Sequence, residues 1–281
     1  MPYGTLLLHL DDSAHCDARI DLTIHLAGTF GSHVVGLAAS GRTPFAESAG
    51  AGFLRRDDLA SALAATRRLA EARAQHFDER MRASTAAASH EAIVDDDDDA
   101  PALVRHGLCA DLVILGQPDP SEPDHARARS QFELALLHGA PPALVLPHVA
   151  AQATAGRRIL VAWNGTRECA RAAAAARPLL QKAEEVRILQ CETPLDAIDA
   201  AQAPGIDRAR DWLARNGVLA DARLLPAGID AGGALIAHAH EMGADLVVMG
   251  AWGRMRWSER LFGGATRTML ASTNVALLLA R

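Results

Sequence analysis

The sequence predicts an α/β fold with two tandem doubly wound domains, each built on a five-stranded parallel sheet. Its apolar runs recur in the same order in both halves of the chain, which indicates a duplication. The runs are short and continuous, as expected when helices cover both faces of a parallel sheet. Each half also alternates strand-like with helix-like segments, a pattern typical of α/β domains.

Four blocks carry the evidence for the duplication. In each block, an apolar run of strand length is flanked by similar residues in the two copies. The paired blocks are 6–16 with 159–169, 33–37 with 185–189, 109–116 with 243–250, and 142–146 with 275–279. Small residues at 150–156 would join the copies, so we expect one domain at residues 1–150 and a second at residues 156–281.

The first strand of each copy ends in a short acidic or amide turn. Ser13 and Thr166 follow these turns at the start of alanine-rich segments, where a hydroxyl can accept a hydrogen bond from a first-turn N–H group. We therefore expect both residues to cap helices. Asp11 and Asp12, in the turn of the first copy, are interpreted as caps or relics of a site and not as ligands.

The segments after the second strand differ between the copies. The first copy has a Gly-, Ser- and Ala-rich excursion at 40–56 and a helix over 57–82, whereas the second has a loop at 192–205 and a shorter helix over 206–216. The acidic run 95–99 is predicted to be a solvated helix start, which the helix dipole favours. A metal role for this run would require ligands from elsewhere in the chain.

Composition limits the function classes. The chain has 281 residues, a formal net charge of −6 and 4% aromatic residues, which argues against a nucleic-acid-binding surface. No run approaches the roughly 18 apolar residues of a membrane span, and the N-terminus lacks a signal peptide's basic region, so we expect a cytoplasmic protein without a membrane partner. The cysteines lack C-x-x-C spacing and are predicted to be buried small apolar residues; they are Cys16, Cys109, Cys169 and Cys191.

The most informative segment lies near the C-terminus. An apolar run ends at Gly250, Gly253 follows, and the pair Gly263 and Gly264 precedes an apolar segment typical of a helix. Glycine lets a ligand approach the backbone closely, and N–H groups at a helix start attract anions. The pattern therefore predicts a phosphate-binding cradle, although it lacks the lysine of a P-loop.

The spacing Gly250-x2-Gly253-x9-Gly263 resembles the nucleotide-binding signature of the universal stress protein family, and the strands at 159–166 and 274–279 are similar to those of the family. The resemblance covers nearly the whole chain and indicates the tandem, two-domain form. It implies the adenine-nucleotide alpha-hydrolase-like fold, which binds at the carboxyl ends of its strands. It further implies a stress-response sensor or regulator whose second domain binds ATP or another adenine nucleotide, with or without Mg²⁺.

The resemblance also places the nucleotide-binding residues by position. Asn164 stands where the family has an aspartate that meets the nucleoside, and the backbone near Leu189 would face the adenine. Glycine N–H groups and an arginine would contact the ribose and phosphates. The predicted nucleotide-binding residues are Asn164, Leu189, Gly250, Gly253, Arg254, Gly263, Gly264 and Ala265. Because Gly264 replaces a Ser or Thr and Asn164 brings no charge to a metal ion, we expect modest affinity.

The first copy departs further from the signature. Gly116 is retained, but Asp119 replaces the second glycine, and Ser130 with Gln131 replaces the last two. Nearby prolines remove N–H donors, and acidic residues would repel phosphate. We therefore expect this domain to keep the fold without the nucleotide site.

A dedicated enzyme is not expected, although slow ATP hydrolysis is left open. The chain has no G-x-S-x-G elbow, and His238 and His240 lie two apart in a predicted helix, where they cannot share one face. The alternative to a nucleotide-binding stress protein is a nucleotide-free interaction module whose glycine loop is structural. In the family the last strands of two domains pair, which implies an intramolecular pseudo-dimer here and leaves a further homodimer open.

Overall fold

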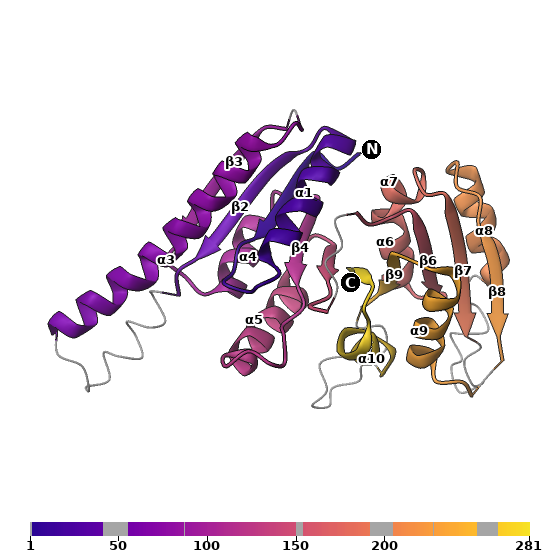
Figure 1. Cartoon of the computed structure of the whole chain (residues 1–281). Coiled ribbons are helices and arrows are strands. Elements are labelled where there is room, and N and C mark those ends of the chain that lie inside the picture. Colours follow the sequence, from indigo (N-terminus) through magenta and orange to yellow (C-terminus); the bar gives the residue numbers. More distant parts are fainter. Residues whose placement is uncertain are drawn as a thin grey trace. The chain divides into compact units, whose positions relative to one another are not determined.

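The computed structural model describes residues 2–41, 56–86, 88–149, 154–191, 205–226, 228–251 and 264–281 (Figure 1). The chain divides into two compact units, Pro2–Pro141 and Pro142–Arg281. Parallel strands alternate with helices in both, so the predicted α/β class and the tandem arrangement are confirmed. The domain limits at 150 and 156 mark the sequence repeat and stay a prediction.

The first unit alternates strands with helices along the chain. Its elements, within the residues that the structure describes, are β1 (Thr5–His9), α1 (Cys16–Phe30), β2 (His33–Ala39), α3 (Arg56–Ala83), β3 (His90–Asp95), α4 (Asp99–Gly107), β4 (Leu112–Gly116) and α5 (His125–His138). The strands are parallel in the order β3-β2-β1-β4. Helix α3 packs on β2 and β3, and α4 packs against α5 (Figure 1).

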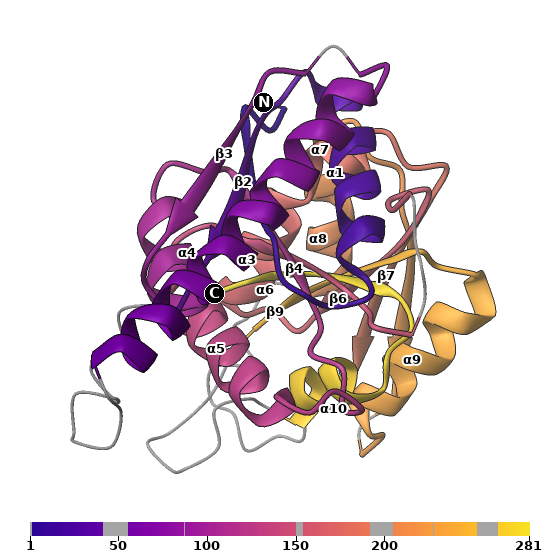
Figure 2. The same ribbon diagram turned by 60° about the vertical axis from the view of Figure 1, so that its left-hand side comes forward.

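The second unit repeats this plan. Its described elements are β5 (Ala143–Leu146), β6 (Arg158–Trp163), α6 (Arg167–Ala175), α7 (Arg177–Leu180), β7 (Glu185–Cys191), α8 (Ile206–Arg215), β8 (Asp221–Leu225), α9 (Ala231–Met242), β9 (Leu246–Gly250), α10 (Gly264–Ser272) and β10 (Ala276–Ala280). Strands β10-β9-β6-β7-β8 are parallel in this order. Helices α9 and α10 lie side by side (Figures 1 and 2).

Strand β5 pairs antiparallel with β10, with Leu144 opposite Leu278. These are the last strands of the two sequence repeats, so the expected pairing between them is confirmed. The pairing also explains why the compact second unit begins at Pro142, ahead of the sequence repeat.

The central strands are buried on both faces. Leu6, Leu7 and Leu8 of β1 are at most 1% exposed, and Leu246 and Val247 of β9 are fully buried. Each such side chain contributes about 1.5–3 kcal/mol by leaving water. Burial on two faces requires apolar residues at successive positions, which is why these runs do not alternate.

The two predicted helix caps behave differently. Thr166 caps α6 through its Oγ1, which accepts from Cys169 N at 3.5 Å, so this prediction is confirmed. The prediction that Ser13 caps a helix is wrong, because α1 begins only at Cys16 and has no side-chain cap. The Ser13 hydroxyl donates to Asp11 Oδ1 and accepts from Arg19 Nη1, and these bonds replace the cap.

The acidic run 95–99 starts a helix as predicted, since α4 begins at Asp99. It is not simply solvated, because its carboxylates accept hydrogen bonds from side chains of other elements. Asp95 accepts from Arg105 at 2.7 Å and lies 2.9 Å from His106 Nε2. Partial burial raises the pKa of Asp95, but these bonds outweigh it and lower the pKa to about 2. No group of His, Cys, Asp or Glu in the described part of the chain could hold a metal ion.

The four cysteines are free, but they are not uniformly buried. Cys169 is buried, Cys16 and Cys191 are half-buried, and Cys109 is exposed, so the prediction of buried cysteines is wrong for Cys109. Cys109 follows α4 in a surface turn, where no element covers it. Among the helices that the structure describes, none is long and apolar enough to cross a bilayer.

Candidate functional site

A cavity of about 560 Å³ opens in the second unit at the carboxyl ends of β6, β7 and β9. Ligands bind at this edge of open α/β sheets, and the volume is typical of small-molecule sites. Five of the predicted nucleotide-binding residues line it, namely Asn164, Leu189, Gly250, Gly264 and Ala265. The other three, Gly253, Arg254 and Gly263, lie outside the described residues.

Gly250 ends β9 where α6 crosses it. A Cβ at this position would lie 2.5 Å from Cys169 N and 2.7 Å from Glu168 C, both backbone atoms. Only glycine therefore lets the first turn of α6 pack this closely on the strand. This packing supplies a structural reason for Gly250 that is independent of any ligand.

Gly264 begins α10 and differs from Gly250. A Cβ at Gly264 would meet no heavy atom of the described residues within 4 Å. The N–H groups of a helix's first turn have no partner within the helix, and the helix dipole makes this end positive. Since Gly264, Ala265 and Thr266 line the cavity, α10 presents an anion-attracting end to it.

Asn164 lies in the turn between β6 and α6. Its Oδ1 accepts from Thr166 N at 3.1 Å and from Thr166 Oγ1 at 2.8 Å. Thr166 Oγ1 in turn accepts from Cys169 N. This chain of hydrogen bonds fixes the amide at the rim of the cavity by joining it to the first turn of α6.

The turn before α9 also contributes to the cavity, and the sequence prediction missed it. Asp230 lines the cavity and caps α9, with Oδ1 accepting from Gly232 N at 3.2 Å and Oδ2 from Gly233 N at 3.0 Å. Burial, together with the Asp230 carboxylate, raises the pKa of the neighbouring Cys191 thiol. An aspartate directly before an apolar helical segment is a capping signal that could have identified this residue.

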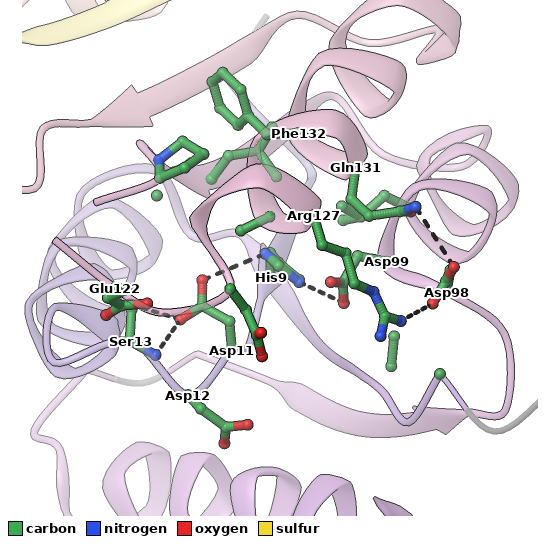
Figure 3. Close-up of a pocket in the computed structure, with 18 of the residues that line it drawn as sticks. His9, Asp11, Asp12, Ser13, Asp98, Asp99, Glu122, Arg127, Gln131 and Phe132 are labelled. Carbon is green, nitrogen blue, oxygen red and sulfur yellow. Dashed lines mark hydrogen bonds and ion pairs between the residues drawn. The ribbon is translucent and has the colours of Figure 1, made fainter. Parts of the chain in front are cut away.

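The first unit has its own cavity, of about 390 Å³, at the carboxyl ends of β1, β2 and β4 (Figure 3). Acidic residues outnumber basic ones in its lining. The carboxylates are Asp11, Asp12, Asp98, Asp99, Asp119, Glu122 and Asp124, whereas the basic residues are Arg73, Arg127 and His9. Such an excess of negative charge repels phosphate groups.

Arg19 of α1 occupies the space beside Gly116 at the end of β4. It is 1% exposed, forms an ion pair with Asp11, and lies so close to Gly116 that a Cβ there would be 2.1 Å from its Nη1. The aligned residues of the second repeat are Ala172 and Gly250. The sequence prediction missed Arg19, although an arginine inside an apolar helical segment was a signal that it needs a buried partner.

His9, at the end of β1, lies between two acidic residues of this cavity (Figure 3). Its Nε2 is 2.9 Å from Asp99 Oδ1, and its Nδ1 is 3.7 Å from Asp11 Oδ2. Burial lowers the pKa of His9, but the two carboxylates outweigh it and raise the pKa above its ordinary value. Burial likewise raises the pKa of Asp11, and the nearby Arg19 and His9 outweigh it and hold that pKa well below its usual range.

Comparisons with known proteins identify the family. The model of the universal stress protein family matches residues 156–281. A universal stress protein from Archaeoglobus fulgidus DSM 4304 superposes with a TM-score of 0.73 at 14% identity, covering 99% of this chain and 96% of that chain. A protein from Pseudomonas aeruginosa UCBPP-PA14 assigned as a universal stress protein superposes with a TM-score of 0.59 at 18% identity, covering 99% and 93%.

No curated protein sequence matches the chain. At these identities the structural likenesses show the shared fold, and the family model supplies the assignment. The second domain, residues 156–281, therefore belongs to the universal stress protein family, and the chain carries two α/β domains in tandem.

Proposed function

We propose that the second domain binds ATP or another adenine nucleotide and that the protein acts as a cytoplasmic sensor or regulator of the stress response. One observation carries the proposal. Asn164, Leu189, Gly250, Gly264 and Ala265, distant in sequence, line a single cavity at the ligand-binding edge of the sheet.

The walls of the cavity suit the parts of a nucleotide. Leu189, Leu235 and Met249 provide apolar surface for a base. The first turn of α10 provides N–H groups for phosphate oxygens. In this arrangement Gly253, Arg254 and Gly263 would add backbone donors and a cation beside the phosphates, as their sequence positions predict.

The proposed role is binding and not catalysis. Asp230 is the one carboxylate among the described lining residues, and both its oxygens accept N–H groups at the start of α9. Helix capping therefore accounts for this carboxylate without a catalytic role. Slow ATP hydrolysis is compatible with the proposal but is not part of it.

A second candidate function is a nucleotide-free interaction module. The packing at Gly250 favours it, because the close approach of α6 requires glycine there even without a ligand. The two candidates differ in what Gly264 does, since no described residue packs against the position of its missing Cβ.

The test uses the purified full chain. We expect adenine nucleotide among the small molecules released on denaturation, and a thermal shift at millimolar ATP. Gly264→Val should remove the shift while leaving folding intact, because the added methyl groups enter open space beside the helix start. The matched control is Gly205→Val at the start of α8, which also has no atom within 4 Å and does not line the cavity.

Three results would count against nucleotide binding. Release of no nucleotide together with no thermal shift favours the interaction module. An ATP-induced thermal shift in Gly264→Val as large as in the wild type means that the nucleotide site lies elsewhere. If Gly205→Val loses the ATP-induced thermal shift to the same extent, the loss in Gly264→Val comes from a valine at a helix start and not from the cavity.

A further inference from the structure

Asp230 brings a negative charge to the cavity in which an anionic nucleotide is placed. It is the N-cap residue of α9, it is exposed, and it lines the cavity. A carboxylate repels phosphate and attracts N–H and O–H donors. The position of Asp230 therefore bears on which part of the nucleotide lies beside α9.

The helix cap leaves the Asp230 carboxylate able to accept further hydrogen bonds. Its Oδ1 accepts from Gly232 N at 3.2 Å and its Oδ2 from Gly233 N at 3.0 Å, so the described part of the chain fills one acceptor site on each oxygen. A carboxylate has about four acceptor sites on its two oxygens. Because the residue is exposed on the cavity wall, each oxygen can take a second hydrogen bond from a bound molecule while the cap stays in place.

Close packing fixes the start of α9 against α10. Gly232, in the first turn of α9, lies so close to Thr268 of α10 that a Cβ on the glycine would be 2.5 Å from Thr268 Cβ. The two helices lie side by side (Figures 1 and 2). Thr268 follows Gly264 by about one helical turn, or about 6 Å along the helix. Asp230 is therefore held on the helix next to the one that would bind phosphate, near that subsite but not in it.

The ribose hydroxyls of a nucleotide match this position. The ribose joins the base to the phosphates, so its hydroxyls are the neutral donors nearest the phosphate chain, whereas the amine of adenine lies at the far end. The apolar surface of Leu189, Leu235 and Met249 suits the base. In dinucleotide-binding α/β domains, an acidic residue accepts from a ribose hydroxyl in the same way. A carboxylate beside the phosphate subsite is therefore suited to the sugar.

We propose that Asp230 accepts a hydrogen bond from a ribose hydroxyl of the nucleotide bound in the second domain, with the phosphates at the start of α10. This inference rests on the proposed function and adds the residue that recognises the sugar. Asp230 thereby favours ribonucleotides over nucleotides whose sugar lacks hydroxyl groups.

Calorimetric titration of the full chain with ATP and with 2′,3′-dideoxy-ATP tests the inference. The wild type should bind ATP about tenfold or more tightly than the dideoxy analogue, as expected for a hydrogen bond to a charged group. In Asp230→Ser the two affinities should become similar, and α9 should be retained because serine is as good an N-cap as aspartate. ATP and the analogue carry the same charge, so their affinity ratio does not depend on the charge that the substitution removes.

Asp207→Ser is the matched control. It removes the same charge from the exposed first turn of α8, outside the described cavity lining, and should keep the wild-type ratio. A wild type that binds ATP and the dideoxy analogue equally tightly overturns the ribose contact alone. An Asp230→Ser variant that keeps the wild-type ratio does the same, because Asp230 would then serve only as a helix cap.

Inosine triphosphate, which lacks the adenine amine, separates the sugar from the base. The preference for ATP over inosine triphosphate should be the same in the wild type and in Asp230→Ser. Loss of this preference in the variant would mean that the carboxylate faces the base, and it would overturn the ribose contact. A wild type that binds none of the three nucleotides overturns the proposed function and this inference with it.

Discussion

At the residue scale, the two copies form the same strand–helix turn from residues of different charge. In the first domain the turn residue Asp11 is paired with the buried Arg19, and His9 and Asp99 form a second pair beside it. In the second domain Asn164 and Ala172 stand at the aligned positions of Asp11 and Arg19. One cavity is therefore bordered by internal ion pairs, whereas Asp230 is the one charged side chain in the described lining of the other.

The His9–Asp99 pair predicts a pH dependence of stability. The raised pKa of His9 gives stability that is complete below its unfolded value near 6.5 and is lost as pH rises through the folded value. The lowered pKa values of Asp11 and Asp99 give stability that is complete above about pH 4 and is lost as pH falls. These contributions are all complete only between about pH 4 and pH 6.5.

Urea denaturation across this range, with His9→Gln as the variant, provides the measurement. The variant should lose about 1–3 kcal/mol at pH 5.5, because Asp99 keeps its burial without a charged partner. The difference from wild type should shrink as pH rises above neutrality. A difference that stays constant up to pH 9 would show that His9 is neutral in the folded protein.

At the element scale, the packing of α6 on β9 predicts how much a methyl group added at Gly250 lowers the stability of the protein. Gly250→Ala should destabilise the protein by about 1–3 kcal/mol, since backbone atoms of α6 cannot retreat from the added Cβ. Gly264→Ala is the control and should change stability by less than about 0.5 kcal/mol, because its Cβ meets nothing. Equal effects in chemical denaturation would mean that α6 is free to shift.

The elements also show which features a sequence predicts well. Continuous apolar runs predicted the buried strands, and local signals predicted the cap at Thr166 and the start of α4 at Asp99. The cap at Ser13 failed because Arg19, a turn further along, binds the hydroxyl. Pairing between distant residues, as in His9 with Asp99, leaves no local pattern and needs the folded sheet.

At the scale of the whole molecule, the duplication explains how much of the site was predictable. The resemblance to the family's glycine signature predicted that Asn164, Gly250 and Gly264 lie in one site, and these three residues line one cavity. It did not show that Asp230 closes the same cavity, because the turn before α9 carries no family glycine. The sequence also did not reveal that Arg19 packs against Gly116 in the first domain.

The asymmetry between the domains predicts one nucleotide per chain. Carboxylates outnumber basic residues in the lining of the first domain's cavity, and Arg19 covers Gly116, so ATP should be repelled there and accepted only in the second domain. Calorimetric titration of the full chain should therefore give a stoichiometry near one, and Gly264→Val should reduce it to zero. A stoichiometry of two, or binding that survives in Gly264→Val, would mean that the acidic cavity also accepts nucleotide and that charge does not decide between the domains.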